Sequence, residues 1–321
     1  MKARFFFMSI AAVLLLFTHC VKEDRIGNPP SGDGTVRFIA GLASTRVTSL
    51  GDDQSEWEDG DTIGVYMVDG TKAFTDASIL AANKAYVASN STGKVADFAW
   101  VDSANIIMFP QQTDSIVHFY AYYPYASLIN ALSYEIRVPQ NQDDKTPKTM
   151  DILYSGEKAQ FKKGSGKVAL KFSHKMVKLV FHITDKSSVA GDFSSGLKLE
   201  ISNMYENGAL SLTNGTVRTT STQRIIVDTY VTVNGATLGM AEAFVLPMTN
   251  IVADKVKLTF TKGSGAQAAV FEAELPPAQN SNSLESGSRY IYQVELKDRS
   301  VSIVGTIEDW IEHEGPVIEP S

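Results

Sequence analysis

Side chains that could bind a metal ion or carry catalysis are few in this sequence. Five histidines are present, and those after His19 do not have metal-ligand spacing such as HExxH. His118 and His182 lie in apolar segments of strand-like composition, so we interpret both as solvated or hydrogen-bonded strand residues. The chain has neither a GxSxG nucleophile elbow nor a GxxxxGKS/T phosphate loop. The sequence therefore predicts no catalytic group, no metal site and no cofactor.

Carboxylates concentrate in one short segment that could hold calcium or supply an acid–base pair. The segment contains Asp52, Asp53, Glu56, Glu58, Asp59 and Asp61. Their spacing does not match an EF-hand loop, so a solvated turn is the simpler interpretation. A hydrolase that uses a hidden pair of carboxylates is an alternative that these residues leave open.

Four tyrosines close together could form a platform for stacking against sugar rings. They are Tyr120, Tyr122, Tyr123 and Tyr125. Aromatic side chains in strands also pack into cores and along sheet edges, and we favour that interpretation here.

The charge balance excludes one class of partner. The chain has 29 Lys and Arg against 36 Asp and Glu, a formal net charge of −7, and no long basic run. Binding to phosphate backbones needs clustered basic residues, so we expect no nucleic-acid partner. The single cysteine, Cys20, excludes a disulfide framework and a cysteine-rich zinc site.

The amino terminus has the pattern of an export signal. Lys2 and Arg4 precede an apolar run from Phe5 to Phe17, which is too short to cross a bilayer as a helix. Cys20 ends this run, at the position that a lipoprotein signal peptidase would leave as the acylated first residue. We predict a lipoprotein signal peptide over residues 1–19 and a flexible tether, rich in Gly and Pro, over residues 20–34. An ordinary secretory signal with a chance cysteine is the alternative.

From Thr35 onward, apolar residues alternate with a period of two, which is typical of strands with one buried face. In the first such segment this face carries Val36, Phe38, Ala40 and Leu42. Further strands are expected at 62–68, 115–125, 133–138, 151–155, 167–172, 176–184, 197–202, 224–233, 255–261, 268–275, 289–296 and 300–307. So many short strands without intervening helices predict an all-β protein of β-sandwiches. We place two sandwich domains, each with its own core, at residues 35–165 and 166–321.

Several segments together resemble the fimbrillin family of Bacteroidetes, the fimbrillin-like or Mfa-like surface pilus subunits. Residues 57–66 resemble the W-x-x-G-D-x-I-G-V-Y stretch of that family, and HFYAYYPY (118–125) resembles its aromatic strand. LKFSHKMVKLVFHI (170–183), AFVLPM (243–248), GSRYIYQVEL (287–296) and TIEDW (306–310) also fit, in the same order. Lys22-Glu23-Asp24 resembles the signal that follows the lipid cysteine in surface-exposed lipoproteins of these bacteria.

The resemblance implies a fold, a location and an assembly mechanism. The fold would be two transthyretin-like β-sandwiches in tandem, anchored in the outer membrane through Cys20 and part of a cell-surface fimbria. Family members are cut by an Arg-specific protease after the first strand, and Arg46 stands in the matching place. The cut would free the strand that carries Val36, Phe38, Ala40 and Leu42, and a donated strand would replace it. The candidates in the donor strand are Val301, Ile303 and Ile307.

The implied function is that of a structural or adhesive subunit whose partners are other fimbrial subunits. The alternative is a surface lipoprotein that never polymerises and binds a glycan or a protein on a host or bacterial surface.

Overall fold

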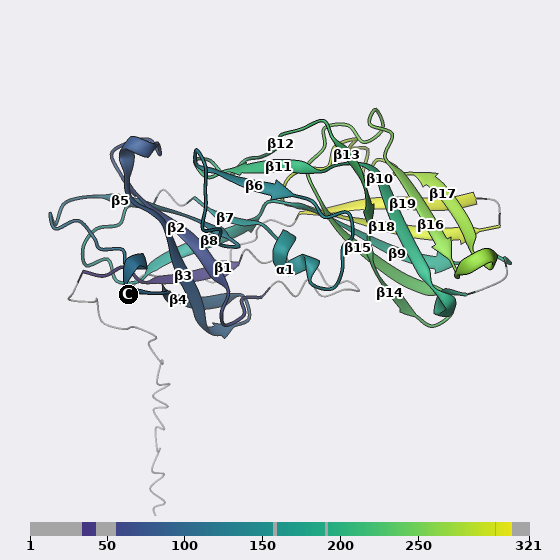
Figure 1. The fold of residues 1–321 in the computed structure, drawn as a ribbon, viewed down its shortest axis with the longest axis horizontal. Helices are drawn as coiled ribbons and strands as arrows, with labels where there is room; N and C mark the ends of the chain where they lie inside the picture. The colour runs from purple at the N-terminus through teal and green to yellow at the C-terminus, as the bar shows by residue number, and fades with distance from the viewer. Residues whose placement is uncertain (1–33, 43–55, 157–158, 190–191, 299, 310–321) are drawn as a thin grey trace, which may run out of the picture.

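β-Strands make up most of the described chain and form two units in tandem (Figure 1). The structure is a computed structural model, and it describes residues 34–42, 56–156, 159–189, 192–298 and 300–309. The one α-helix among these residues is α1 (Thr146–Met150). Single 3-10 turns occur at η1 (Asp76–Ser78), η2 (Ser103–Asn105), η3 (Phe193–Ser195) and η4 (Gly265–Gln267). No helix in the described ranges is long and apolar enough to cross a membrane.

The strands of the first unit close into a ring in the order β1-β4-β3-β2-β5-β7-β8. Their bounds are β1 Phe38–Leu42, β2 Thr62–Asp69, β3 Ile79–Thr92, β4 Val95–Trp100, β5 Val117–Tyr123, β7 Leu153–Ser155 and β8 Val168–His174. Alternate residues of each strand point inward, and large apolar side chains such as Phe98, Phe119 and Phe172 fill the interior.

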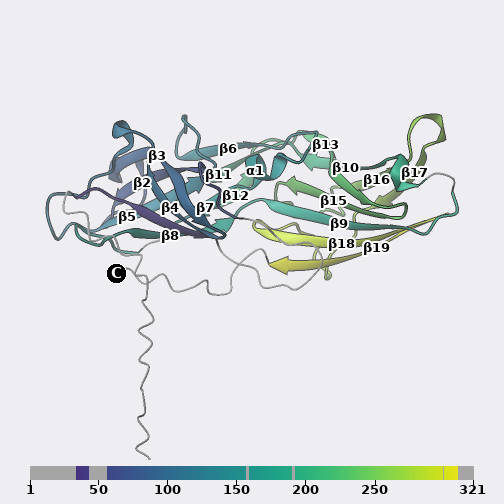
Figure 2. The same cartoon turned by 90° about the horizontal axis from the view of Figure 1, so that it is seen from below.

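Two sheets form the second unit, in the orders β13-β10-β16-β17 and β14-β15-β9-β18-β19. The first contains β10 Leu197–Tyr205, β13 Arg224–Asp228, β16 Lys257–Lys262 and β17 Ala269–Glu274. The second contains β9 Val177–Asp185, β14 Tyr230–Asn234, β15 Leu238–Val245, β18 Ser288–Lys297 and β19 Ser300–Asp309. β19 is an edge strand and pairs with β18 along its whole length (Figure 2).

A third, small sheet joins the two halves of the chain. It consists of β6 Ser133–Arg137, β11 Asn207–Ser211 and β12 Val217–Thr219, with β11 in the middle. Beyond β6, the buried side chain of Gln142 donates to the carbonyl of Phe244 and accepts from its N–H, both at 2.8 Å. The backbone pairing of β6 with β11 and the hydrogen bonds of the Gln142 side chain both link the two units. The chain between β5 and β7 therefore holds the second unit against the first.

The all-β tandem fold expected from the sequence is confirmed, with three differences. The first unit closes as a ring instead of two separate sheets. β8 lies beyond the boundary expected at residue 166 and pairs with β1 and β7, because the glycine-rich stretch before it turns within the first unit. Tyr66, Tyr120 and Tyr122 of the first unit share a core with the second, so the cores are not separate.

A buried ion pair in the second unit gives the fold a specific acid sensitivity. Lys262 Nζ lies 2.7 Å from Asp185 Oδ2, and the two side chains are 1% and 5% exposed. Burial opposes ionisation of Asp185, but hydrogen bonds from Lys262 and Ser187 outweigh it and hold the pKa of this carboxyl below its ordinary value. The resulting stability is fully present above the ordinary pKa and is lost as the pH falls through the lowered one.

We therefore expect Asp185→Asn to lower the free energy of unfolding by about 1–3 kcal/mol near neutral pH. The difference from the wild type should narrow as the pH falls below about 4. Urea unfolding across that range measures it, and Glu135→Gln, at an exposed carboxylate, is the control. A difference that does not change with pH would contradict the assignment.

Candidate functional site

β1 occupies a special place in the ring of the first unit. It pairs antiparallel with β4, placing Phe38 opposite Phe98 and Ala40 opposite Ala96. On its other side it pairs parallel with β8, with Phe38 next to Val168. Among the described strands, β1 alone joins β4 to β8. The ring is therefore closed by this one short strand, drawn in purple in Figure 1.

The inward side chains of β1, and that of Val36 two residues before it, are buried. Val36, Phe38 and Ala40 are 0% exposed and Leu42 is 7% exposed. The Phe38 ring makes edge-to-face contacts with Tyr86 and Phe119, at centroid distances of 4.8 and 5.2 Å. Tyr86 donates its hydroxyl to the Val36 carbonyl at 3.3 Å, and burial raises its pKa to about 12. Taking β1 away would expose an apolar interior and two unpaired strand edges.

Trp57 closes one end of this interior and fixes the chain near the point where the described residues resume after β1. The side chain is 3% exposed and packs edge-to-face on Phe98, Phe172 and Tyr123, at 5.0, 5.3 and 5.5 Å. Its backbone N–H donates to the Gly93 carbonyl at 3.0 Å. Residues from Trp57 onward are thus anchored to the ring independently of β1.

The expected donor residues lie in the second unit. Val301, Ile303 and Ile307 are on one face of β19 and pack, partly buried, against the larger core. Val304, on the opposite face, is 63% exposed. β19 and β1 belong to different sheets and do not pair with each other. Cys20 and Arg46 fall outside the described residues, so lipidation and cleavage stay predictions.

The chemistry-bearing side chains do not gather at this site. Among the described residues, no three His, Cys, Asp or Glu side chains lie close enough to hold a metal ion. His118 Nδ1 contacts the Ala159 carbonyl at 3.0 Å. His174 Nδ1 and Asp151 Oδ1 lie 2.6 Å apart, a contact that was not predicted from the sequence. No pattern links these two residues in sequence, because β7 and β8 bring them together.

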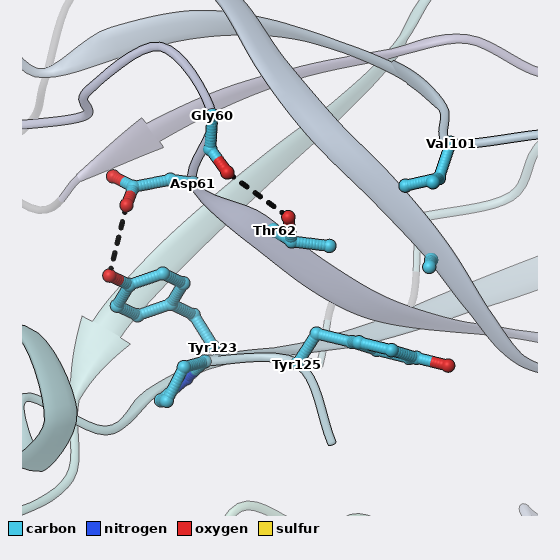
Figure 3. A pocket seen from close by; sticks show the side chains of 8 residues that line it. Gly60, Asp61, Thr62, Val101, Tyr123 and Tyr125 are labelled. Atoms are coloured by element: carbon cyan, nitrogen blue, oxygen red, sulfur yellow. Dashed lines mark hydrogen bonds between the residues drawn. The ribbon is translucent and has the colours of Figure 1, made fainter. Parts of the chain in front are cut away.

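The tyrosine-rich segment splits between the core and a shallow pocket. Tyr120 and Tyr122 are buried, at 6% and 0% exposure, so the four tyrosines do not form one platform. The pocket has a volume of about 500 Å³ and is lined by Gly60, Asp61, Thr62, Ala85, Val101, Tyr123, Pro124 and Tyr125 (Figure 3). Tyr123 donates its hydroxyl to Asp61 Oδ1 at 3.0 Å. Burial, with Asp61 adding to it, raises the pKa of Tyr123.

Gly64 allows two of the sequence motifs, residues 57–66 and residues 118–125, to lie side by side. It follows the Gly60-Asp61 turn in β2, opposite Tyr122 of β5. A Cβ atom on Gly64 would lie 2.2 Å from the Tyr122 ring, so only glycine allows that ring to cross the strand.

Comparison with known proteins gives consistent matches over nearly the whole chain. The family described as fimbrillin-like matches residues 45–310. A candidate fimbrium subunit of Bacteroides uniformis, Fim1C, is 29% identical over 317 residues, which cover 97% of this chain and 96% of that protein.

Two solved structures share the fold. A candidate cell adhesion protein from Bacteroides uniformis is 26% identical with a TM-score of 0.67, covering 87% of this chain and 99% of that one. Another from Bacteroides ovatus is 20% identical with a TM-score of 0.65, covering 90% of this chain and 100% of that one.

Proposed function

The chain belongs to the fimbrillin-like family, and from that premise we propose that it is a subunit of a cell-surface fimbria assembled by protease-triggered strand exchange. β1 is the strand that leaves, and a strand of a neighbouring subunit takes its place. The observation that carries the proposal is that β1 alone, among the described strands, closes the ring between β4 and β8.

Cleavage after Arg46 supplies a trigger because of where it falls in the chain. Leu42 is the last residue of β1, and the anchored segment begins at Trp57. A cut between them separates β1 from everything that follows, so only its ladder hydrogen bonds and its inward side chains still hold it. The same cut separates the lipid on Cys20, with residues 20–46, from the rest of the chain, and so removes the outer-membrane anchor.

The groove left by β1 suits an incoming strand. β4 and β8 would present unpaired N–H and C=O groups, and the interior would present pockets at every second position. β-Augmentation uses both features, since ladder hydrogen bonds give affinity and the pockets give specificity. β19, with Val301, Ile303 and Ile307 on one face, is the proposed donor.

Substituting Arg46 tests this function directly. We expect Arg46→Ala in the native host to leave the amino terminus unprocessed and to remove this subunit from fimbriae, seen by electron microscopy and by amino-terminal sequencing. Arg46→Lys should behave in the same way, because it keeps the charge but not the recognised side chain. Arg37→Ala is the control, since Arg37 precedes β1 and is exposed. Fimbriae of normal length with normal processing in the Arg46→Ala strain would contradict the proposal.

A non-polymerising binding module is the second candidate, favoured by the pocket beside Tyr125. Tyr123, Pro124 and Tyr125 offer apolar surface next to the Asp61 carboxylate, a combination found in sites for polar ligands with an apolar face. This function requires the purified, processed chain to stay monomeric with or without cleavage. Multimers that appear only after cleavage would exclude it.

A further inference from the structure

We infer that β19 of a second copy enters the groove in the same direction as β1, with Gly305 in the place of Ala40. This inference rests on the proposed function and adds to it the orientation and register of the donated strand. It follows from the order of side-chain sizes along the two strands.

Along both strands, the inward residues follow the same order of side-chain size. In and before β1 the series is Val36, Phe38, Ala40, Leu42, and in β19 it is Val301, Ile303, Gly305, Ile307. Each series reads medium, large, small, large at every second residue. Since alternate residues of a strand face the same side, β19 can present its series to the groove without any shift of register.

The opposite direction would misplace the small residue. Gly305 would then stand in the place of Phe38 and leave empty the space beside Tyr86 and Phe119, which Phe38 contacts at 4.8 and 5.2 Å. In the same direction as β1, the Ile303 side chain fills part of that space. Ile303 would stand in the place of Ala40, which is 0% exposed and paired with Ala96 and Leu170. One position would hold a cavity and another would be overpacked, and both are unfavourable in a close-packed interior.

The outward faces of the two strands also agree at their middle. Val304, at the middle of the aligned segment, takes the place of Ile39 in either direction. Val304 is 63% exposed in β19, while Ile39 is half-buried between its neighbours in the ring. The exposed valine would therefore lose contact with water when it replaces the isoleucine.

Gly305 cannot itself be used as the test. A Cβ atom there would lie 2.5 Å from the Tyr292 ring in the subunit's own sheet, so a substitution would damage the donor before exchange. Residues on the outward face avoid this difficulty, and they distinguish the two directions.

Direction decides which outward residues face each other. Gly41 lies opposite Val95, and one step beyond the pair Phe38–Phe98 the register places Arg37 opposite Ala99. In the same direction as β1, Thr306 takes the place of Gly41 and Ser302 that of Arg37. Thr306 then faces Val95 and Ser302 faces Ala99. In the opposite direction, the two partners are exchanged.

The test uses four double-cysteine variants of the full chain, displayed on cells. Two are expected to crosslink, Thr306→Cys with Val95→Cys and Ser302→Cys with Ala99→Cys. Two are mismatched controls, Thr306→Cys with Ala99→Cys and Ser302→Cys with Val95→Cys. Cross-strand neighbours come within disulfide reach, whereas residues four positions apart along a strand do not. Mild oxidation of isolated fimbriae should give a ladder of multimers on a non-reducing denaturing gel for the first two variants alone.

Each other outcome overturns the inference in a distinct way. Ladders from the mismatched variants alone would show that the strand enters in the opposite direction. Fimbriae that form but give no ladder in any variant would show that β19 is not the inserted strand. Fimbriae that fail to form even from the wild-type chain would contradict the proposed function itself. Single-cysteine variants, which should not give ladders, show whether each substitution alone permits assembly.

Discussion

Replacing Phe38 with alanine is expected to lower the free energy of unfolding of the uncut chain by about 3–5 kcal/mol. The side chain is 0% exposed and lies edge-to-face against Tyr86 and Phe119. Its removal takes away the transfer free energy of a phenyl ring and leaves a cavity where β1 joins β4 to β8. Because β1 closes the ring, the loss falls on the part of the unit that opens in the proposed exchange.

Urea unfolding of the uncut chain measures this effect, and Ile39→Ala is the matched control. Ile39 belongs to the same strand but points away from the interior and is half-buried. We expect Ile39→Ala to lower the free energy of unfolding by less than half as much as Phe38→Ala does. Assembled fimbriae give a second measurement. In the proposed mechanism β1 has left the ring there, so Phe38→Ala fimbriae should dissociate at the same urea concentration as the wild type. A small effect on the uncut chain would contradict the role of β1 as the closing strand.

Alternation of apolar residues was enough to predict β1 and β19 from the sequence. Phe38, Ala40 and Leu42 at every second position indicate one buried face, and β1 has that face in the ring. The same period marks Val301, Ile303 and Ile307 in β19. Such positions are predictable because one face of each strand is apolar whatever its partner strand is.

β3 was not predicted, since its sequence lacks that signal. ILAANKAYVASNST mixes alanines with polar residues, and Asn83 and Asn90 have positive φ angles of 44° and 52°. The strand is held by its pairing with β2 and β4 on either side. Partners far away in sequence therefore decide this segment, and no local pattern reveals them.

The junction between the units could not be predicted from the sequence either. Glu206-Asn207-Gly208 has the composition of a turn, yet Asn207 begins β11 and Glu206 is buried at 4% exposure with Arg137 bound to its carboxylate at 2.9 Å. Gln142, in a segment that reads as a polar loop, makes the two bonds to Phe244. Both cases depend on tertiary contacts that satisfy buried polar groups, and composition alone does not show where such contacts form.

In the proposed mechanism β1 must leave the ring before the subunit assembles, and a reversible lock on β1 tests this requirement. Ile39 of β1 lies directly opposite Asp97 of β4. The Leu42 N–H bonds the Lys94 carbonyl, so every second pair is hydrogen-bonded and the pair of Ile39 and Asp97 is not. Side chains of such pairs are the closer ones, which suits a disulfide between Ile39→Cys and Asp97→Cys.

The control joins two strands that stay in place during exchange. Val87 of β3 lies opposite Ala99 of β4, so Val87→Cys with Ala99→Cys adds a disulfide without holding β1. Both oxidised variants should be cut after Arg46. The control should then assemble into fimbriae, while in the locked variant the amino-terminal fragment stays attached.

The decisive measurement is the length of fimbriae formed by the oxidised, cut Ile39→Cys/Asp97→Cys chain, before and after a reductant is added. We expect no fimbriae before reduction and normal fimbriae after it. Fimbriae of normal length from the oxidised, locked chain would contradict the proposed mechanism.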